Sequence, residues 1–97
     1  MPWGRKRYQQ APCLHFVTFS CYRREPLLDG PRARETFEAE LERVRKWYGL
    51  WVTGYVVMSE HVHLLVSEPE QATLAVALQM LKQNVSRGLA HPFAPKN

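Results

Sequence analysis

At 97 residues, the chain has room for one domain with a modest hydrophobic core. Hydrophobic residues make up 45% of it and charged residues 23%, and no apolar run approaches the ~20 residues that a membrane-spanning helix needs. The net charge of +4 is unevenly spread. Residues 1–34 hold seven Lys or Arg and two acids, residues 35–70 hold three Lys or Arg and seven acids, and residues 71–97 hold three Lys or Arg and no acid. Acid-poor ends indicate a basic face suited to a polyanion, although ordinary solvation also accounts for so small a charge.

The first twelve residues, MPWGRKRYQQAP, are predicted to form a basic arm. No apolar stretch follows them, so they do not have the form of a secretory signal. We therefore expect a cytoplasmic protein that does not associate with membranes.

A strand is predicted at residues 14–22, LHFVTFSCY, because aromatic and β-branched residues favour strands. Alternate residues share a face, and both faces are largely apolar, so we expect a central strand. The two cysteines, Cys13 and Cys21, would be about 26 Å apart along one strand, which is too far for a disulfide.

A helix is predicted to begin at Asp29-Gly30-Pro31, because a proline in the first helical turn loses no hydrogen bond. Gly49 is its expected C-terminal cap. Its apolar face is formed by residues spaced four, three and four apart, namely Phe37, Leu41, Val44 and Tyr48.

Two more strands are predicted at residues 50–58 and 61–66, joined by Ser59-Glu60 in a tight hairpin. Thr73 is the expected N-cap of a second helix. The order strand, helix, strand, strand, helix is most of a ferredoxin-like βαββαβ arrangement. The sequence therefore predicts an α+β fold, in which two helices cover an antiparallel sheet that lacks the last strand. The second helix has its apolar face at Leu74, Leu78, Leu81 and Val85.

Two histidines, His61 and His63, stand in the otherwise apolar run VVMSEHVHLLV. Residues two apart on a strand share a face, so both imidazoles project the same way, about 7 Å apart, while Val62 and its alternate neighbours face a core. Two neutral imidazoles on one face can converge on a metal ion, or they can simply form a half-exposed polar face. Two ligands do not complete a site, because zinc takes about four and magnesium or manganese about six.

The segment GYVVMSEHVHLLVSEP resembles the signature of the HUH tyrosine transposases, especially the REP-associated branch. HUH denotes histidine, hydrophobic residue, histidine, here His61-Val62-His63. HFVTFSCYRREPLL is similar to that family's first strand and following loop, and LAVALQMLKQNVSRGL to its second helix. The resemblance covers roughly residues 8–90.

The resemblance implies DNA transposition, with binding of hairpins and cutting and rejoining of single-stranded DNA. It implies that His61 and His63 bind a divalent ion, magnesium or manganese, at the scissile phosphate. It also implies a tyrosine that attacks phosphorus to give a 5′-phosphotyrosine, which stores the bond for rejoining. A homodimer is a further expectation, because some members of the family form dimers and a missing edge strand leaves a sheet edge unpaired.

The sequence departs from the family at the nucleophile. The resemblance places the catalytic tyrosine after a further strand, beyond Asn97, and so predicts a truncated chain that lacks it. Glu60 is the nearest carboxylate for a third metal ligand; a regular strand would turn it away, but the turn before His61 can break the alternation. His15 and His91 are weaker candidates. The tyrosines present are predicted to be non-catalytic: Tyr8, Tyr22, Tyr48 and Tyr55.

The predicted organisation is a single domain over residues 1–97, with the arm at 1–12, a βαββα core at 13–90 and an irregular tail at 91–97. Three hypotheses stay open: a transposase-family domain without its nucleophile, a non-catalytic module that binds single-stranded nucleic acid, and an inactive remnant. The residues expected to contact DNA are basic, joined by one tyrosine of the arm: Arg5, Lys6, Arg7, Tyr8, Arg23, Arg24, Lys82 and Arg87.

Overall fold

The computed structural model describes residues 13–89 and residue 93, so the predicted basic arm, with Arg5, Lys6, Arg7 and Tyr8, and His91 of the tail lie outside the described residues. The described elements follow the predicted order, and the α+β fold is confirmed. In chain order they are β1 (Leu14–Ser20), the 3-10 helix η1 (Tyr22–Arg24), α1 (Pro31–Tyr48), β2 (Val52–Val57), β3 (His61–Ser67) and α2 (Leu74–Gly88).

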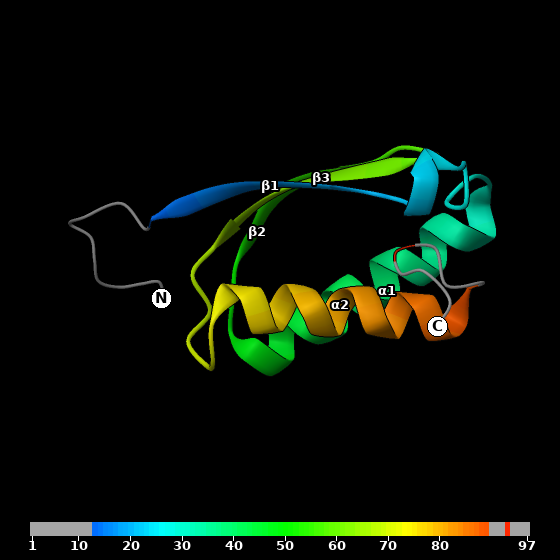
Figure 1. The fold of residues 1–97 in the computed structure, drawn as a ribbon. Helices are drawn as coiled ribbons and strands as arrows, with labels where there is room; N and C mark the ends of the chain where they lie inside the picture. Colours follow the sequence, from blue (N-terminus) through cyan, green and yellow to red (C-terminus); the bar gives the residue numbers. More distant parts are fainter. Residues whose placement is uncertain (1–12, 90–92, 94–97) are drawn as a thin grey trace.

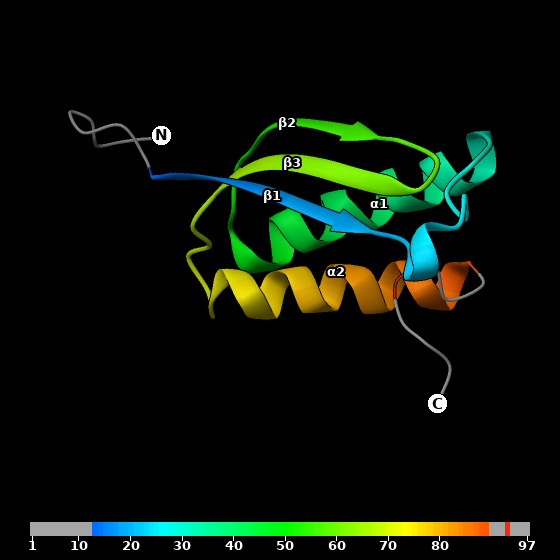
Figure 2. The same cartoon turned by 45° about the horizontal axis from the view of Figure 1, so that its top comes forward.

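The three strands form one antiparallel sheet in the order β1-β3-β2. Thr18 of β1 lies opposite His63 of β3, and Ser20 lies opposite His61. Within the described sheet, β3 is therefore central and β1 is an edge strand (Figure 2). The prediction that the first strand is central is wrong for the described sheet, because β1 pairs with β3 alone. Its second face is also uncovered, and Phe16 on that face is exposed.

Both helices lie on one face of the sheet, which leaves the other face free of helices (Figure 1). We call these the covered face and the open face. Val62, Leu64 and Val66 of β3 point into the covered face and are at most 1% exposed, as predicted from the strand alternation. They pack against the apolar faces of the helices, where Phe37 of α1 and Leu81 of α2 are fully buried.

The predicted helix ends are confirmed. Pro31 is the first residue of α1, and Gly49 ends it in the left-handed conformation at φ 69°. Thr73 caps α2, since its Oγ1 accepts a hydrogen bond of 3.2 Å from the backbone N–H of Val76. The two cysteines are free thiols, and burial raises the pKa of Cys21.

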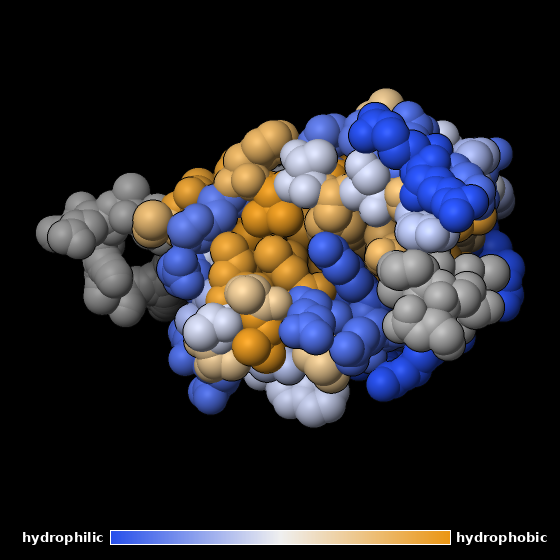
Figure 3. Space-filling view, viewed as in Figure 1, coloured by the Kyte–Doolittle hydropathy of each residue, from blue (hydrophilic) through white to orange (hydrophobic). Residues whose placement is uncertain are grey.

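The outer edge of β1 faces a side of the molecule where apolar side chains gather between β1 and α2 (Figure 3). Val17 of β1 and Leu74 and Leu78 of α2 are partly buried and pack against the core. In the part of the chain that the structure describes, no strand pairs with this edge. None of the helices in that part is long and apolar enough to cross a membrane.

Candidate functional site

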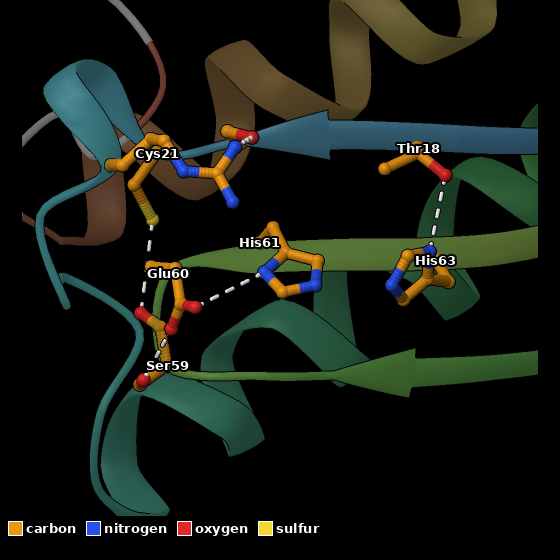
Figure 4. A network of polar contacts seen from close by, with 8 residues as sticks. Thr18, Cys21, Ser59, Glu60, His61 and His63 are labelled. Carbon is orange, nitrogen blue, oxygen red and sulfur yellow. Dashed lines mark hydrogen bonds and ion pairs between the residues drawn. The ribbon is translucent and has the colours of Figure 1, made fainter.

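The two histidines of β3 project together from the open face, as their spacing predicts. Their ring centroids are 4.7 Å apart and their planes are perpendicular, so the rings lean together more closely than the strand rise alone would place them. Figure 4 shows the two imidazoles facing each other, with one nitrogen of each ring turned toward the gap between them. The side chain of His61 is only 16% exposed, so this pair lies in a partly desolvated setting.

The other nitrogen of each ring, Nδ1, lies next to a neighbouring oxygen. Nδ1 of His63 is 3.1 Å from Oγ1 of Thr18, which stands directly opposite on β1. Nδ1 of His61 is buried, makes no hydrogen bond, and lies 3.4 Å from Oε2 of Glu60. The nitrogens that face the gap are therefore the two Nε2 atoms, and histidines that bind metals commonly have an oxygen partner on the second nitrogen in this way.

Glu60 lies in the turn before β3, and there the strand alternation breaks, so its carboxylate sits beside His61 (Figure 4). Its Oε1 accepts a hydrogen bond of 2.7 Å from the Ser59 hydroxyl. This bond, helped by the nearby His61 and Arg24, lowers the pKa of Glu60. The carboxylate is therefore ionised at neutral pH and can hold the imidazole of His61 in a fixed orientation.

The site can be tested against the ion that the family resemblance implies. Among the described residues, no group of three or more His, Cys, Asp or Glu side chains is arranged to hold a metal. The protein would thus supply two imidazole nitrogens, and water or phosphate oxygens would have to complete the coordination. Magnesium and manganese accept this, because such ions keep several waters and bind phosphates directly. The residues fit a weakly held divalent ion better than a closed zinc site.

Arg24 lies at the end of the histidine pair. Its Nη1 donates a hydrogen bond of 3.2 Å to Oγ of Ser20, the residue opposite His61. Arg23 and Arg24 both have left-handed backbone conformations, at φ 58° and 56°. Such a conformation costs a non-glycine residue roughly 1–2 kcal/mol, and strain of this kind gathers at functional sites. The strained turn places a guanidinium next to the imidazoles.

Comparison with known proteins identifies the family. The family model described as "Transposase IS200 like" matches residues 9–97. The chain belongs to this transposase family. The family carries out DNA transposition, and its members generally use a divalent metal. No curated protein matches the chain.

Two solved structures share the fold of this IS200-like transposase chain. A candidate transposase from Deinococcus radiodurans R1 has a TM-score of 0.70 at 19% identity, covering 88% of this chain and 65% of its own. A REP-associated tyrosine transposase bound to a REP hairpin has a TM-score of 0.68 at 19% identity, covering 95% of this chain and 59% of its own. This chain thus spans less than two thirds of each of these proteins.

The predicted DNA-contacting residues do not all share the surface of the histidine pair in this IS200-like chain. Lys82 and Arg87 lie on α2, in the helical layer behind the sheet. Nζ of Lys82 lies 4.8 Å over the ring of Phe19, and Arg87 donates to Asn84 at 3.4 Å. Of the basic residues that the structure describes, Arg24 is the one with contacts that place it next to the pair.

His15 also stands apart from the histidine pair. It lies on the covered side of β1, where its Nε2 is 2.5 Å from Oε2 of Glu68. Tyr55 stands opposite Leu64 and so faces the covered side, where its hydroxyl donates to Glu38 at 3.0 Å. Neither residue can join His61 and His63 without a change of fold.

The sequence analysis missed Thr18, Ser20 and Phe16 as members of the site. The alternation of the first strand already put these three on one face. The missing signal was the register between β1 and β3, which sets Thr18 against His63 and Ser20 against His61. The register between two strands that are far apart in sequence cannot be predicted from the residues of either strand alone.

Proposed function

We propose that the open face binds single-stranded or hairpin DNA, and that His61 and His63 hold a divalent ion, magnesium or manganese, against a DNA phosphate. The observation that carries this proposal is the pair of imidazoles, 4.7 Å apart, with their free nitrogens turned toward one gap. Membership of a transposase family supports a DNA partner, as does the similarity of the fold to a transposase bound to a REP hairpin.

In this proposal the protein's own side chains orient the site. Thr18 holds the ring of His63 through the hydrogen bond of 3.1 Å between its hydroxyl and Nδ1; when Nδ1 is the donor, the lone pair lies on Nε2. The carboxylate of Glu60 stands beside Nδ1 of His61 at 3.4 Å, on the other side of the pair, and so acts as an orienting partner rather than as a third ligand. When bound, the ion would neutralise phosphate charge and polarise the phosphorus–oxygen bond as a Lewis acid.

Arg24 extends the site toward a neighbouring phosphate of the DNA backbone. Its guanidinium carries a fixed positive charge and several N–H donors, which match phosphate oxygens. Because it is tied to Ser20 beside His61, we propose that it contacts a phosphate next to the one at the ion. Lys82 and Arg87 on α2, together with the basic arm, stay predicted contacts for DNA farther from this site.

Strand cleavage needs a nucleophile in addition to this site. Of the tyrosines in the described residues, none makes a hydrogen bond with either imidazole, and Tyr55 faces the opposite side of the sheet. We therefore propose binding and orientation of DNA as the activity of these residues. The absence of a catalytic tyrosine and the homodimer both stay predictions.

Isothermal titration with manganese tests the ion site. We expect wild type to bind one ion and the double variant His61→Ala/His63→Ala to bind none. His15→Ala is the matched control, because it removes a histidine from the covered side of the same sheet. Circular dichroism of all three proteins confirms the fold. Equal isotherms for wild type and the double variant would refute the metal site.

DNA binding is measured separately, by fluorescence anisotropy of a labelled hairpin with a single-stranded extension. We expect affinity to fall when EDTA removes the ion, and to fall steeply as salt rises. A non-catalytic binding module that needs no ion would bind equally with and without EDTA.

A further inference from the structure

Phe16 stands out on the open face, in the middle of β1. It is 70% exposed, the highest value among the large hydrophobic side chains that the structure describes. Full burial of a phenylalanine stabilises a fold by about 1.5–3 kcal/mol, so the described fold gains little from this ring. Leu14 and Val56 are exposed on the same face, and apolar side chains gathered on one face indicate a surface that meets a partner.

The ring of Phe16 is aligned with the histidine pair. It lies parallel to the imidazole of His63 within 12°, with centroids 5.6 Å apart, in an offset stack. His63 in turn meets His61 edge to face. The three rings therefore form a row along the open face, with the aromatic ring at one end and Arg24 beyond the other.

The open face beside Phe16 includes a position without a side chain. Leu65 lies directly opposite it on β3, and Gly54 lies opposite Leu65 on β2. A Cβ atom at Gly54 would meet nothing within 4 Å, so the space above this strand is open. A flat group can therefore approach the exposed ring from the open face without meeting a side chain at Gly54.

From this arrangement we propose that Phe16 stacks an unpaired nucleobase of the DNA strand whose phosphate lies at His61 and His63. The proposal rests on the proposed function, because the ion site fixes where the backbone runs. Phe16 and Thr18 are two residues apart, about 7 Å along the strand, so a base on the ring would neighbour a phosphate at the imidazoles. Stacking on aromatic side chains is how proteins hold single-stranded bases with little regard to sequence.

A second copy of the chain is the competing occupant, and the polar groups of the surface argue against it. The open face also carries the exposed Leu14 and Val56, so its apolar area alone does not separate the two occupants. The row that begins at Phe16 continues through two imidazoles to a guanidinium at its far end, and these groups suit a nucleotide better than an apolar partner.

The test compares two labelled single-stranded octamers, one of thymidylate and one of the same length in which every base is replaced by an abasic site. Affinities of the 97-residue chain for both are measured by fluorescence anisotropy with manganese present. Phe16→Ala removes the ring, and Phe16→Trp keeps an aromatic face. Trp47→Ala is the matched control, because Trp47 is also exposed, at 63%, but lies on α1 behind the sheet.

We expect Phe16→Ala to weaken binding of the thymidylate octamer by about 5- to 150-fold, the range for loss of one stacked base. Binding of the abasic octamer should not change, Phe16→Trp should bind thymidylate like wild type, and Trp47→Ala should change neither. Equal binding of thymidylate by wild type and Phe16→Ala would overturn the stacking proposal and leave the proposed function standing. Equal losses on both octamers would also overturn it, because Phe16 would then act without a base.

Two further outcomes would reject the stacking proposal on other grounds: failure of the proposed function, or a second copy of the chain on the ring. If wild type binds neither octamer nor the hairpin, the proposed function falls and the stacking proposal falls with it. If light scattering shows a wild-type dimer that Phe16→Ala converts to monomer, the occupant of the ring is a second copy and not a base.

Discussion

The covered and open faces of the sheet are built from alternate residues of the same strands, yet they are used differently. On β3, the covered side carries Val62, Leu64 and Val66, all at most 1% exposed, whereas the open side carries His61 and His63. The covered face is closed by two helices and holds the fold together. The open face contributes little burial, so its side chains are free to be selected for chemistry. One strand thus separates stability from function by a shift of one residue.

The sharpest way to break this comparison is to truncate neighbouring residues on the two faces. Leu64→Ala leaves a cavity among β3, α1 and α2 and should lower the free energy of unfolding by about 2–5 kcal/mol. His63→Ala, one residue away, should lower it by about 1 kcal/mol or less, since it removes a partly exposed ring and one hydrogen bond. Urea denaturation measures both.

Metal titration of the same two variants gives the opposite ranking. His63→Ala should lose manganese binding while it stays folded. Leu64→Ala should keep its metal affinity to the extent that it folds, and measurement at low temperature and low urea keeps enough of it folded. Comparable losses of stability in both variants would mean that the open face also belongs to the core.

Much of this division could be predicted from the sequence. The alternation around His61 and His63 gave the two faces of β3, and spacing by three and four residues gave the buried faces of both helices. These signals are local, because they depend on neighbours within two turns or two residues. The prediction for the first strand failed. Apolar residues on both sides of a strand favour a central place in the sheet, but the sequence pattern is the same whether the second face packs on a core or is left exposed to meet a ligand.

The contents of the site were less predictable. His61 and His63 were predicted as site residues because two histidines spaced two apart in an apolar strand are recognisable from the sequence alone. Thr18 and Ser20 could not be joined to them, because the register between β1 and β3 brings together residues about forty positions apart. Glu60 was ambiguous for a local reason: it lies at a turn, where the direction of a side chain depends on the turn geometry rather than on alternation.

A smaller effect should follow when an orienting partner on the open face is removed. Thr18→Val keeps the shape of the side chain but removes the oxygen next to Nδ1 of His63. We expect manganese affinity to fall about 10- to 100-fold, the usual cost of losing such a partner. The free energy of unfolding should stay within about 0.5 kcal/mol of wild type, because Thr18 is exposed. Thr18→Ser, which keeps the hydroxyl, should bind the ion nearly as well as wild type. Valine and serine variants of equal affinity would show that Thr18 does not orient the ring.

The smallest expected effect comes from the strained turn at Arg24, where stability and DNA binding favour different residues. Arg24→Gly relieves a left-handed conformation at φ 56° and should raise the free energy of unfolding by up to about 1 kcal/mol. The same change removes the guanidinium beside His61, so binding of single-stranded DNA should weaken and its dependence on log salt should fall by about 0.7. Arg24→Lys is the matched control, because it keeps both the charge and the strain and so should change stability little. A glycine variant that gains stability and also keeps wild-type DNA affinity and salt dependence would show that the strain at Arg24 does not serve DNA binding.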